Sequence, residues 1–209
     1  MRGRPASKRH LPVAGTVLLL IDVINDLDFP GSLALVRQAE PMATRLARLK
    51  RRAAHAGIPA VYVNDNFGQW RSDFRRTVAH CTARGSPGRI VSRRLKPTSR
   101  DYFVLKPKHS GFYGTTLSTL LEDLRARRVM VTGIAGNICV LFTANDAYMR
   151  DLTIVAPSDC IVSNTVEENA HALRQLRVVL KADIRPSDRL AFQGRRTEWR
   201  GGHTRTRAY

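Results

Sequence analysis

Short runs of consecutive apolar residues recur along the chain and predict the strands of a sheet. The clearest is TVLLLI at residues 16–21, where apolar side chains occupy both faces instead of alternating with polar ones. Strands that are apolar on both faces are typical of a parallel sheet covered by helices on each side. The other predicted strands are residues 59–64, 102–105, 129–132, 152–157 and 178–184, with a shorter strand-like run at residues 89–92.

The segments between these runs carry apolar residues at helical spacing. In residues 34–56, side chains such as Met42 and Leu46 share one face, and arginines occupy the other. Thr165 with Glu168 three residues later forms the capping-box pattern of a helix start. The predicted helices are residues 34–56, 72–84, 115–127 and 165–176, together with one that begins near Asn137.

This alternation of strands and helices predicts a single α/β domain. A chain of 209 residues fits one domain with a sizeable core. We place the domain at residues 13–190, between disordered basic tails at residues 1–12 and 191–209.

The formal net charge of +18 is concentrated partly at the two ends of the chain. Residues 1–10 contribute +4 and residues 195–209 contribute another +4. Such tails can contact nucleic acid or anionic surfaces non-specifically. The sequence has no nucleic-acid-binding module and no run of aromatic residues between the charges, so we expect solvated tails and no specific nucleic-acid partner.

The cysteines indicate a reducing compartment. Cys81, Cys139 and Cys160 form no CxxC pair, no metal-type cluster with histidine and no even set for disulfides. No signal peptide is recognisable, and the longest apolar run is far too short to span a bilayer. We therefore expect a cytoplasmic protein without a membrane partner.

Three predicted strands lead into residues that can do chemistry. Asp22 follows the strand at residues 16–21, and Lys106 follows the strand at 102–105. Cys139 lies in the first turn of the helix that follows the strand at 129–132. The carboxyl ends of parallel strands meet at one edge of a sheet, where α/β proteins bind their ligands. The pattern predicts that these three side chains share a site.

A carboxylate, an ammonium and a thiol would suit nucleophilic acyl transfer. Asp22 would accept the thiol proton, Lys106 would hold the charges, and Cys139 would attack a carbonyl carbon. The helix start is expected to lower the pKa of the thiol, and the uncovered NH groups near Ala135 and Gly136 can hold an oxyanion. The alternative is a structural thiol, because unpaired cysteines are often buried; this is our interpretation of Cys81 and Cys160.

The usual partner of a catalytic cysteine, a histidine, has no comparable position in this pattern. His55, His80 and His171 all lie within predicted helices. The chain also lacks a GxSxG elbow, a P-loop and a complete dinucleotide fingerprint.

Three segments resemble the isochorismatase-like cysteine hydrolases. They are IDVINDLDFPG near the start, KPKHSGFYGTTL in the middle and GIAGNICVLFTANDAY later. The resemblance covers roughly residues 16–184. It implies a three-layer, Rossmann-like fold with a six-stranded, mostly parallel sheet and helices on both faces. It also implies a catalytic triad of Asp22, Lys106 and Cys139 that needs no cofactor.

The resemblance further implies the geometry of the nucleophile turn. Family members have a cis peptide at the position of Ile134-Ala135, and the NH groups of Ala135 and Cys139 would form the oxyanion hole. This chain departs from many members by having Gly136-Asn137 in place of Thr-Asp.

Two further comparisons with the family bear on the reaction. The nicotinamidase branch binds a metal through an Asp-x-His segment after the second strand, but Asp65-Asn66-Phe67 has no histidine, so we expect neither nicotinamidase activity nor a metal. True isochorismatases hydrolyse a vinyl ether and need no nucleophile. The presence of Cys139 therefore favours C–N bond hydrolysis of a small amide or carbamoyl compound.

Two alternatives stay open at this point: isochorismatase activity, and a non-catalytic binding protein on the same fold. The family often assembles through helices beside the nucleophile turn, so we expect a homo-oligomer. Aromatic side chains in the loops around the site are candidate substrate-binding residues: Phe29, Trp70, Phe112 and Tyr113.

Overall fold

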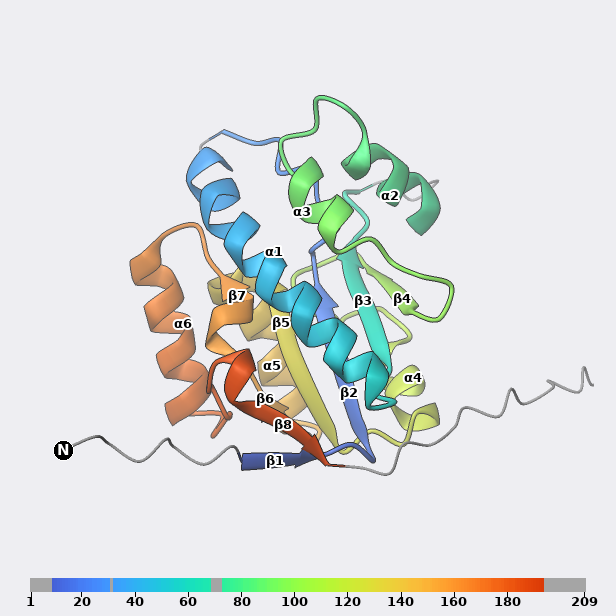
Figure 1. The fold of residues 1–209 in the computed structure, drawn as a ribbon, viewed down its shortest axis with the longest axis vertical. Coiled ribbons are helices and arrows are strands. Elements are labelled where there is room, and N and C mark those ends of the chain that lie inside the picture. Colours follow the sequence, from blue (N-terminus) through green and yellow to red (C-terminus); the bar gives the residue numbers. More distant parts are fainter. Residues whose placement is uncertain (1–8, 31, 69–72, 194–209) are drawn as a thin grey trace, which may run out of the picture.

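Strands and helices alternate along most of the chain (Figure 1). The computed structural model describes residues 9–30, 32–68 and 73–193. The strands are β1 (Arg9–Pro12), β2 (Thr16–Ile21), β3 (Ala60–Asp65), β4 (Tyr102–Lys106), β5 (Arg128–Ile134), β6 (Thr153–Val155), β7 (Ile161–Val162) and β8 (Leu190–Gln193). The α-helices are α1 (Ser32–His55), α2 (Phe74–Thr82), α3 (Arg89–Arg94), α4 (Leu117–Asp123), α5 (Leu141–Tyr148) and α6 (Val166–Val178). Shorter helical turns are the π-helical η1 (Gly136–Val140) and the 3₁₀ turns η2 (Ser158–Cys160) and η3 (Ser187–Arg189).

A six-stranded sheet forms the centre of the fold. Its strands run in the order β4-β3-β2-β5-β6, and β7 pairs with β5 beyond the end of β6. Every pairing in this sheet is parallel, which confirms the predicted fold class. The carboxyl ends of β2, β4 and β5 therefore meet at one edge.

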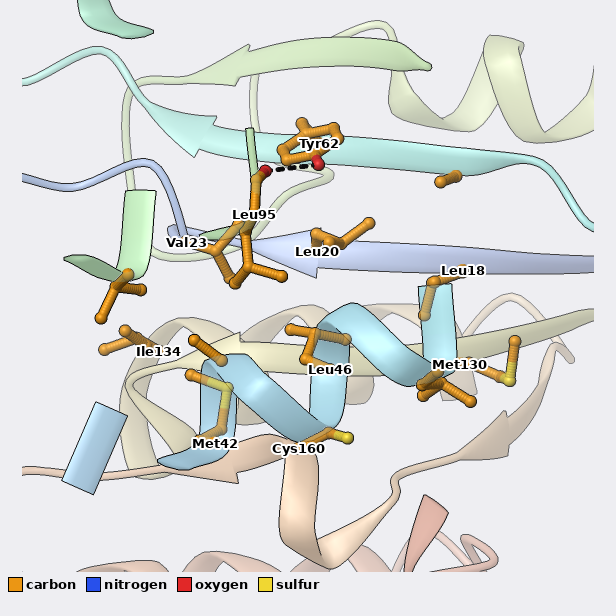
Figure 2. Packing of buried hydrophobic residues seen from close by; sticks show 14 of the residues in the cluster. Leu18, Leu20, Val23, Met42, Leu46, Tyr62, Leu95, Met130, Ile134 and Cys160 are labelled. Atoms are coloured by element: carbon orange, nitrogen blue, oxygen red, sulfur yellow. Dashed lines mark hydrogen bonds between the residues drawn. The ribbon is translucent and has the colours of Figure 1, made fainter. Parts of the chain in front are cut away.

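Helices cover both faces of the sheet, as the apolar strands require. Side chains alternate between the two faces along β2, so Leu18 and Leu20 join one buried cluster while Leu19 joins the other. The first cluster includes Met42 and Leu46 of α1, which lie against the sheet in Figure 2, and residues of α2 and α3. Residues of α4, α5 and α6 belong to the second cluster.

A separate two-stranded parallel sheet joins the two ends of the described chain. β1 pairs with β8 from Arg9↔Leu190 to Pro12↔Gln193. Arg52 of α1 donates hydrogen bonds to the carbonyl oxygens of Ser187 and Leu190, which fixes this sheet beside the core. Both strands extend into segments predicted as tails, while residues 1–8 and 194–209 lie outside the described residues.

The strand-like run predicted at residues 89–92 is wrong, because these residues begin helix α3. Val91 and Leu95 are four residues apart and both point into the core, which is helical spacing. Buried Ser92 adds a long-range anchor, since its hydroxyl donates to the carbonyl oxygen of Asn25 and accepts from the Asn25 NH.

The last predicted strand, at residues 178–184, is also wrong. Helix α6 continues through Val178, and the following segment makes a single parallel bridge between Asp183 and Val155. The start of α6 is as predicted: Thr165 Oγ1 accepts from the Glu168 NH, and the Glu168 carboxylate accepts from the Thr165 NH. Among the described helices, none has the length and apolar character that crossing a bilayer would require.

Candidate active site

Asp22 stands at the carboxyl end of β2 in a tightly held turn. Its backbone adopts φ of 49°, and the residue is only 5% exposed. The Asp65 NH donates to Asp22 Oδ1 over 2.7 Å. Asn64 pairs with both backbone polar groups of Ile24, at 3.2 Å and 2.7 Å, so β3 fixes the chain that leaves Asp22.

Lys106 is the last residue of β4, and it is completely buried. Its Nζ lies 2.8 Å from Asp22 Oδ2 and 3.5 Å from Cys139 Sγ. A second carboxylate is also close, because Asp65 Oδ2 lies 3.5 Å from the same nitrogen. The structure thus brings together Asp22, Lys106 and Cys139, the three residues that the strand exits had singled out.

Cys139 lies in η1, directly after β5. The peptide bond between Ile134 and Ala135 is cis, and the carbonyl oxygen of Ala135 accepts from the NH groups of Ile138 and Val140. Thr143 of α5 donates to the Cys139 carbonyl over 2.7 Å and accepts from the Gly111 NH over 2.9 Å. The Thr143 hydroxyl thus links the helical turn that carries Cys139 to the loop that follows Lys106.

The Gly136 position has room only for glycine. A Cβ there would lie 2.7 Å from both Asn169 Oδ1 and Ile161 Cγ2, and 2.8 Å from Ser163 Oγ. The Ser163 hydroxyl instead accepts from the Asn137 NH and donates to Asn169 Oδ1, both over 3.1 Å. In this chain, which has Gly136-Asn137 in place of Thr-Asp, the turn is supported by Ser163, which lies between β7 and α6.

This packing gives a first prediction. We expect Gly136→Ala to displace the turn that carries Cys139, because the added methyl group cannot fit without moving its neighbours. Turnover should fall by up to about 100-fold, since a displacement of about 1 Å can cost that much. Overpacking should also cost about 1–3 kcal/mol of unfolding free energy. Steady-state kinetics and urea unfolding measure the two effects, and wild-type values for both would show that the turn tolerates the methyl group.

The ionisation of the site differs from one expectation. Burial and the neighbouring Asp22 carboxylate raise the pKa of Cys139 to about 12, with Lys106 acting in the opposite direction. The predicted lowering of the thiol pKa is therefore wrong, because desolvation and a like charge outweigh the ammonium group. Cys139 therefore rests as a thiol, and a role as nucleophile would require a base to accept its proton.

The two partners of the thiol are shifted as well. Burial raises the pKa of Asp22 above its usual range, although Lys106 opposes this shift. Burial lowers the pKa of Lys106, but the carboxylate of Asp22 and the other negative groups outweigh it, so the pKa lies above its ordinary value. Asp22 is thus a stronger base than an exposed aspartate, next to a firmly protonated lysine.

Two residues near Cys139 and Lys106 were not predicted from the sequence as part of the site. His109 Nδ1 lies 3.9 Å from Cys139 Sγ, and its ring packs against Phe142 with centroids 5.5 Å apart. His109 belongs to the loop after β4, so the order of the strands could have suggested it, whereas His55, His80 and His171 drew attention only as helical residues. Asp65 was considered only as part of an unmatched metal segment, although it pairs with Lys106 in the β3–β4 register.

The candidate substrate-binding residues have different surroundings. Phe112 is buried in the second core cluster, and the guanidinium group of Arg150 lies 4.5 Å from its ring centroid. Phe29 and Tyr113 are exposed. Trp70 lies outside the described residues.

The other two thiols lie in the first core cluster, on the opposite face of the sheet from Cys139. Burial and Asp26 raise the pKa of Cys81 to about 12, and burial also raises the pKa of Cys160. Both thiols lie in the apolar core, which fits the structural role predicted for them. In the described part of the chain, no group of three or more His, Cys, Asp or Glu residues is placed to hold a metal ion.

Comparison with known proteins gives consistent results for sequence and structure. Residues 16–184 match the model of the isochorismatase domain. The uncharacterized isochorismatase family protein YaaI of Bacillus subtilis is 42% identical over 85% of this chain and 97% of the relative. The ureidoacrylate amidohydrolase RutB of Acinetobacter baylyi is 26% identical over 78% of this chain and 77% of the relative.

Solved structures share the fold. The pyrazinamidase/nicotinamidase of Streptococcus mutans superimposes with a TM-score of 0.63 at 26% identity, covering 81% of this chain and 99% of that protein. The N-carbamoylsarcosine amidase of Thermoplasma acidophilum gives a TM-score of 0.63 at 24% identity, over 83% and 96% of the two chains.

Proposed function

The chain belongs to the isochorismatase family, and we propose that it is a metal-independent cysteine hydrolase that cleaves the C–N bond of a small amide or carbamoyl compound. The observation that carries this proposal is the buried contact of Lys106 Nζ with both Asp22 Oδ2 and Cys139 Sγ, at 2.8 Å and 3.5 Å. A base, a cation and a thiol in mutual contact are the groups that thiol-based acyl transfer needs.

The first half of the reaction forms an acyl-enzyme. Asp22 accepts the proton of the Cys139 thiol, and the sulfur attacks the carbonyl carbon of the substrate. The carbonyl oxygen becomes an oxyanion, which the NH groups of Ala135 and Cys139 stabilise. The C–N bond then breaks as Asp22 returns the proton to the leaving nitrogen.

The second half releases the product. Asp22, again a carboxylate, takes a proton from water as the hydroxide attacks the thioester carbon. The C–S bond breaks, and the sulfur recovers its proton from Asp22. Lys106 stays protonated throughout and offsets the negative charge on whichever group carries it.

The relatives support the C–N bond as the target. RutB of Acinetobacter baylyi is named an amidohydrolase of ureidoacrylate, and the Streptococcus mutans structure is named a pyrazinamidase/nicotinamidase. Both names describe hydrolysis of amide-type bonds. The two proteins are named for different substrates, so together they support a reaction class rather than one particular amide.

A panel of small amides, ureas, carbamoyl compounds and isochorismate tests the proposal. We expect the wild-type protein to release ammonia or amine from at least one amide or carbamoyl compound without added metal. Hydrolysis of isochorismate alone would assign the chain to vinyl ether chemistry. No turnover of any compound, with unimpaired binding of one, would identify a binding protein.

The pH dependence of turnover follows from the state of Asp22. The base must be a carboxylate to accept the thiol proton, and burial raises its pKa. We expect kcat/KM to fall as the pH decreases through this raised pKa, so the acidic limb lies above the value of about 4 that is usual for aspartate. A profile of kcat/KM that stays flat down to about pH 4 would contradict the role of Asp22 as the base.

A further inference from the structure

Lys106 contacts two carboxylates, of which the triad uses only one. Asp22 approaches its Nζ from the end of β2, and Asp65 approaches from the end of β3, at 2.8 Å and 3.5 Å. Asp22 is almost fully buried, whereas the Asp65 side chain is 32% exposed. The third titratable group near the ammonium group is the thiol of Cys139, at 3.5 Å. His109 contacts the sulfur of Cys139, at 3.9 Å from Nδ1.

The strand register and backbone hydrogen bonds hold Asp65 beside Lys106. It stands opposite Lys106 in the register of β3 and β4, and the Asn66 NH donates to the Lys106 carbonyl oxygen over 3.1 Å. Its carboxylate accepts from the Phe67 NH over 2.6 Å, and its own NH holds Asp22 Oδ1. Asp65 therefore touches both charged members of the triad, one through its backbone and one through its side chain.

We propose that Asp65 is a positioning residue whose carboxylate keeps Lys106 an ammonium ion while Asp22 holds the thiol proton. This inference rests on the proposed function. When Asp22 becomes neutral and the sulfur is bonded to substrate carbon, Lys106 has lost the anion of its nearest ion pair, and the sulfur cannot replace it. Asp65 then remains as an adjacent anion, and its negative charge favours the protonated form of Lys106. Coulomb attraction from Asp65 raises the pKa of Lys106, in agreement with this role.

The same charge acts on the resting enzyme. A carboxylate beside Lys106 makes the whole site bind its protons more firmly, because removing any of them adds negative charge near Asp65. Neutralising Asp65 should therefore let the Cys139 thiol ionise at lower pH. A residue with only a structural role would change the amount of active protein without moving this titration.

The experiment measures alkylation of Cys139 by iodoacetamide as a function of pH, with peptide mass spectrometry to identify the modified cysteine. Asp65→Asn removes the charge and keeps the acceptor for the Phe67 NH. We expect its alkylation curve to lie about one pH unit below that of the wild type, which makes alkylation about tenfold faster at a given pH below the midpoint. Asp123→Asn, the same substitution at an exposed position of α4, should leave the curve unchanged.

Two further variants keep the test decisive. Asp65→Glu retains the charge and should restore the wild-type curve, and Asp65→Ser provides a second neutral variant if Asp65→Asn does not fold. Superimposable curves for the wild type and a folded neutral variant would overturn the inference. Failure of the proposed function would appear separately, as amide turnover that survives Cys139→Ala, because the alkylation assay needs no substrate.

Discussion

Replacing Cys139 with alanine is expected to abolish turnover of the amide substrate while leaving the fold intact. In the proposed mechanism the sulfur forms the acyl-enzyme, so kcat should fall by about four orders of magnitude or more. The side chain is nearly buried but small, and its loss should cost about 1 kcal/mol of unfolding free energy. Steady-state kinetics with the best compound of the panel, together with urea unfolding, measure both quantities.

The control for this variant is Cys81→Ala, which removes a buried thiol from α2 on the other face of the sheet. It should retain wild-type turnover. A Cys139→Ala protein that still hydrolyses the amide would exclude the thiol as nucleophile. An equal loss of turnover in both variants would point to a general effect of removing a buried side chain.

Replacing Lys106 with methionine is expected to cost both stability and turnover. The ammonium group is the buried counter-ion of Asp22, at 2.8 Å, and its removal leaves a desolvated carboxylate. Breaking a buried ion pair in this way typically costs about 3–5 kcal/mol. Turnover should be lost even under conditions where the variant is still folded, because no cation remains to offset the negative charge that moves between Asp22 and the sulfur.

A double variant separates the two effects. Lys106→Met combined with Asp22→Asn removes both charges, so it should be more stable than Lys106→Met alone while remaining inactive. Urea unfolding of the two single variants and the double variant gives the coupling energy. A double variant no more stable than the sum of its parts would show that the two side chains do not stabilise each other.

The meeting of Asp22, Lys106 and Cys139 at one edge of the sheet could be predicted from the sequence, because it follows from strand order and periodicity. Runs such as residues 16–21 are apolar on both faces, which is a property of parallel sheets, and parallel strands bring their exits together. Asp22, Lys106 and Cys139 each follow such a run, and the structure places them in contact. The capping pattern of Thr165 and Glu168 is equally local, and α6 begins there.

Features that depend on tertiary contacts could not be predicted in this way. The raised pKa of Cys139 results from its own burial and from the Asp22 carboxylate, and neither cause is part of an argument from the helix start. Ser92 of α3 is held by hydrogen bonds to Asn25, 67 positions away in the sequence. The proximity of Asp65 to Lys106 depends on the register between β3 and β4, which the sequence pattern does not contain.

The parallel pairing of β1 with β8 is another long-range feature. Its two strands are separated by nearly the whole described chain. Arg52 of α1 holds β8 through two backbone carbonyl groups. Nothing in the local pattern of residues 9–12 or 190–193 marks them as partners.

The covalent intermediate on Cys139 is the most direct test of the account. The substrate found by the panel, or p-nitrophenyl acetate as an acyl donor, is mixed with the protein and quenched in acid, and the peptides are mapped by mass spectrometry. We expect an acyl group on Cys139 that forms and disappears at rates consistent with turnover and is absent from Cys139→Ala. Turnover without any adduct on Cys139, or an adduct that never hydrolyses while turnover continues, would contradict the role of Cys139 as the nucleophile.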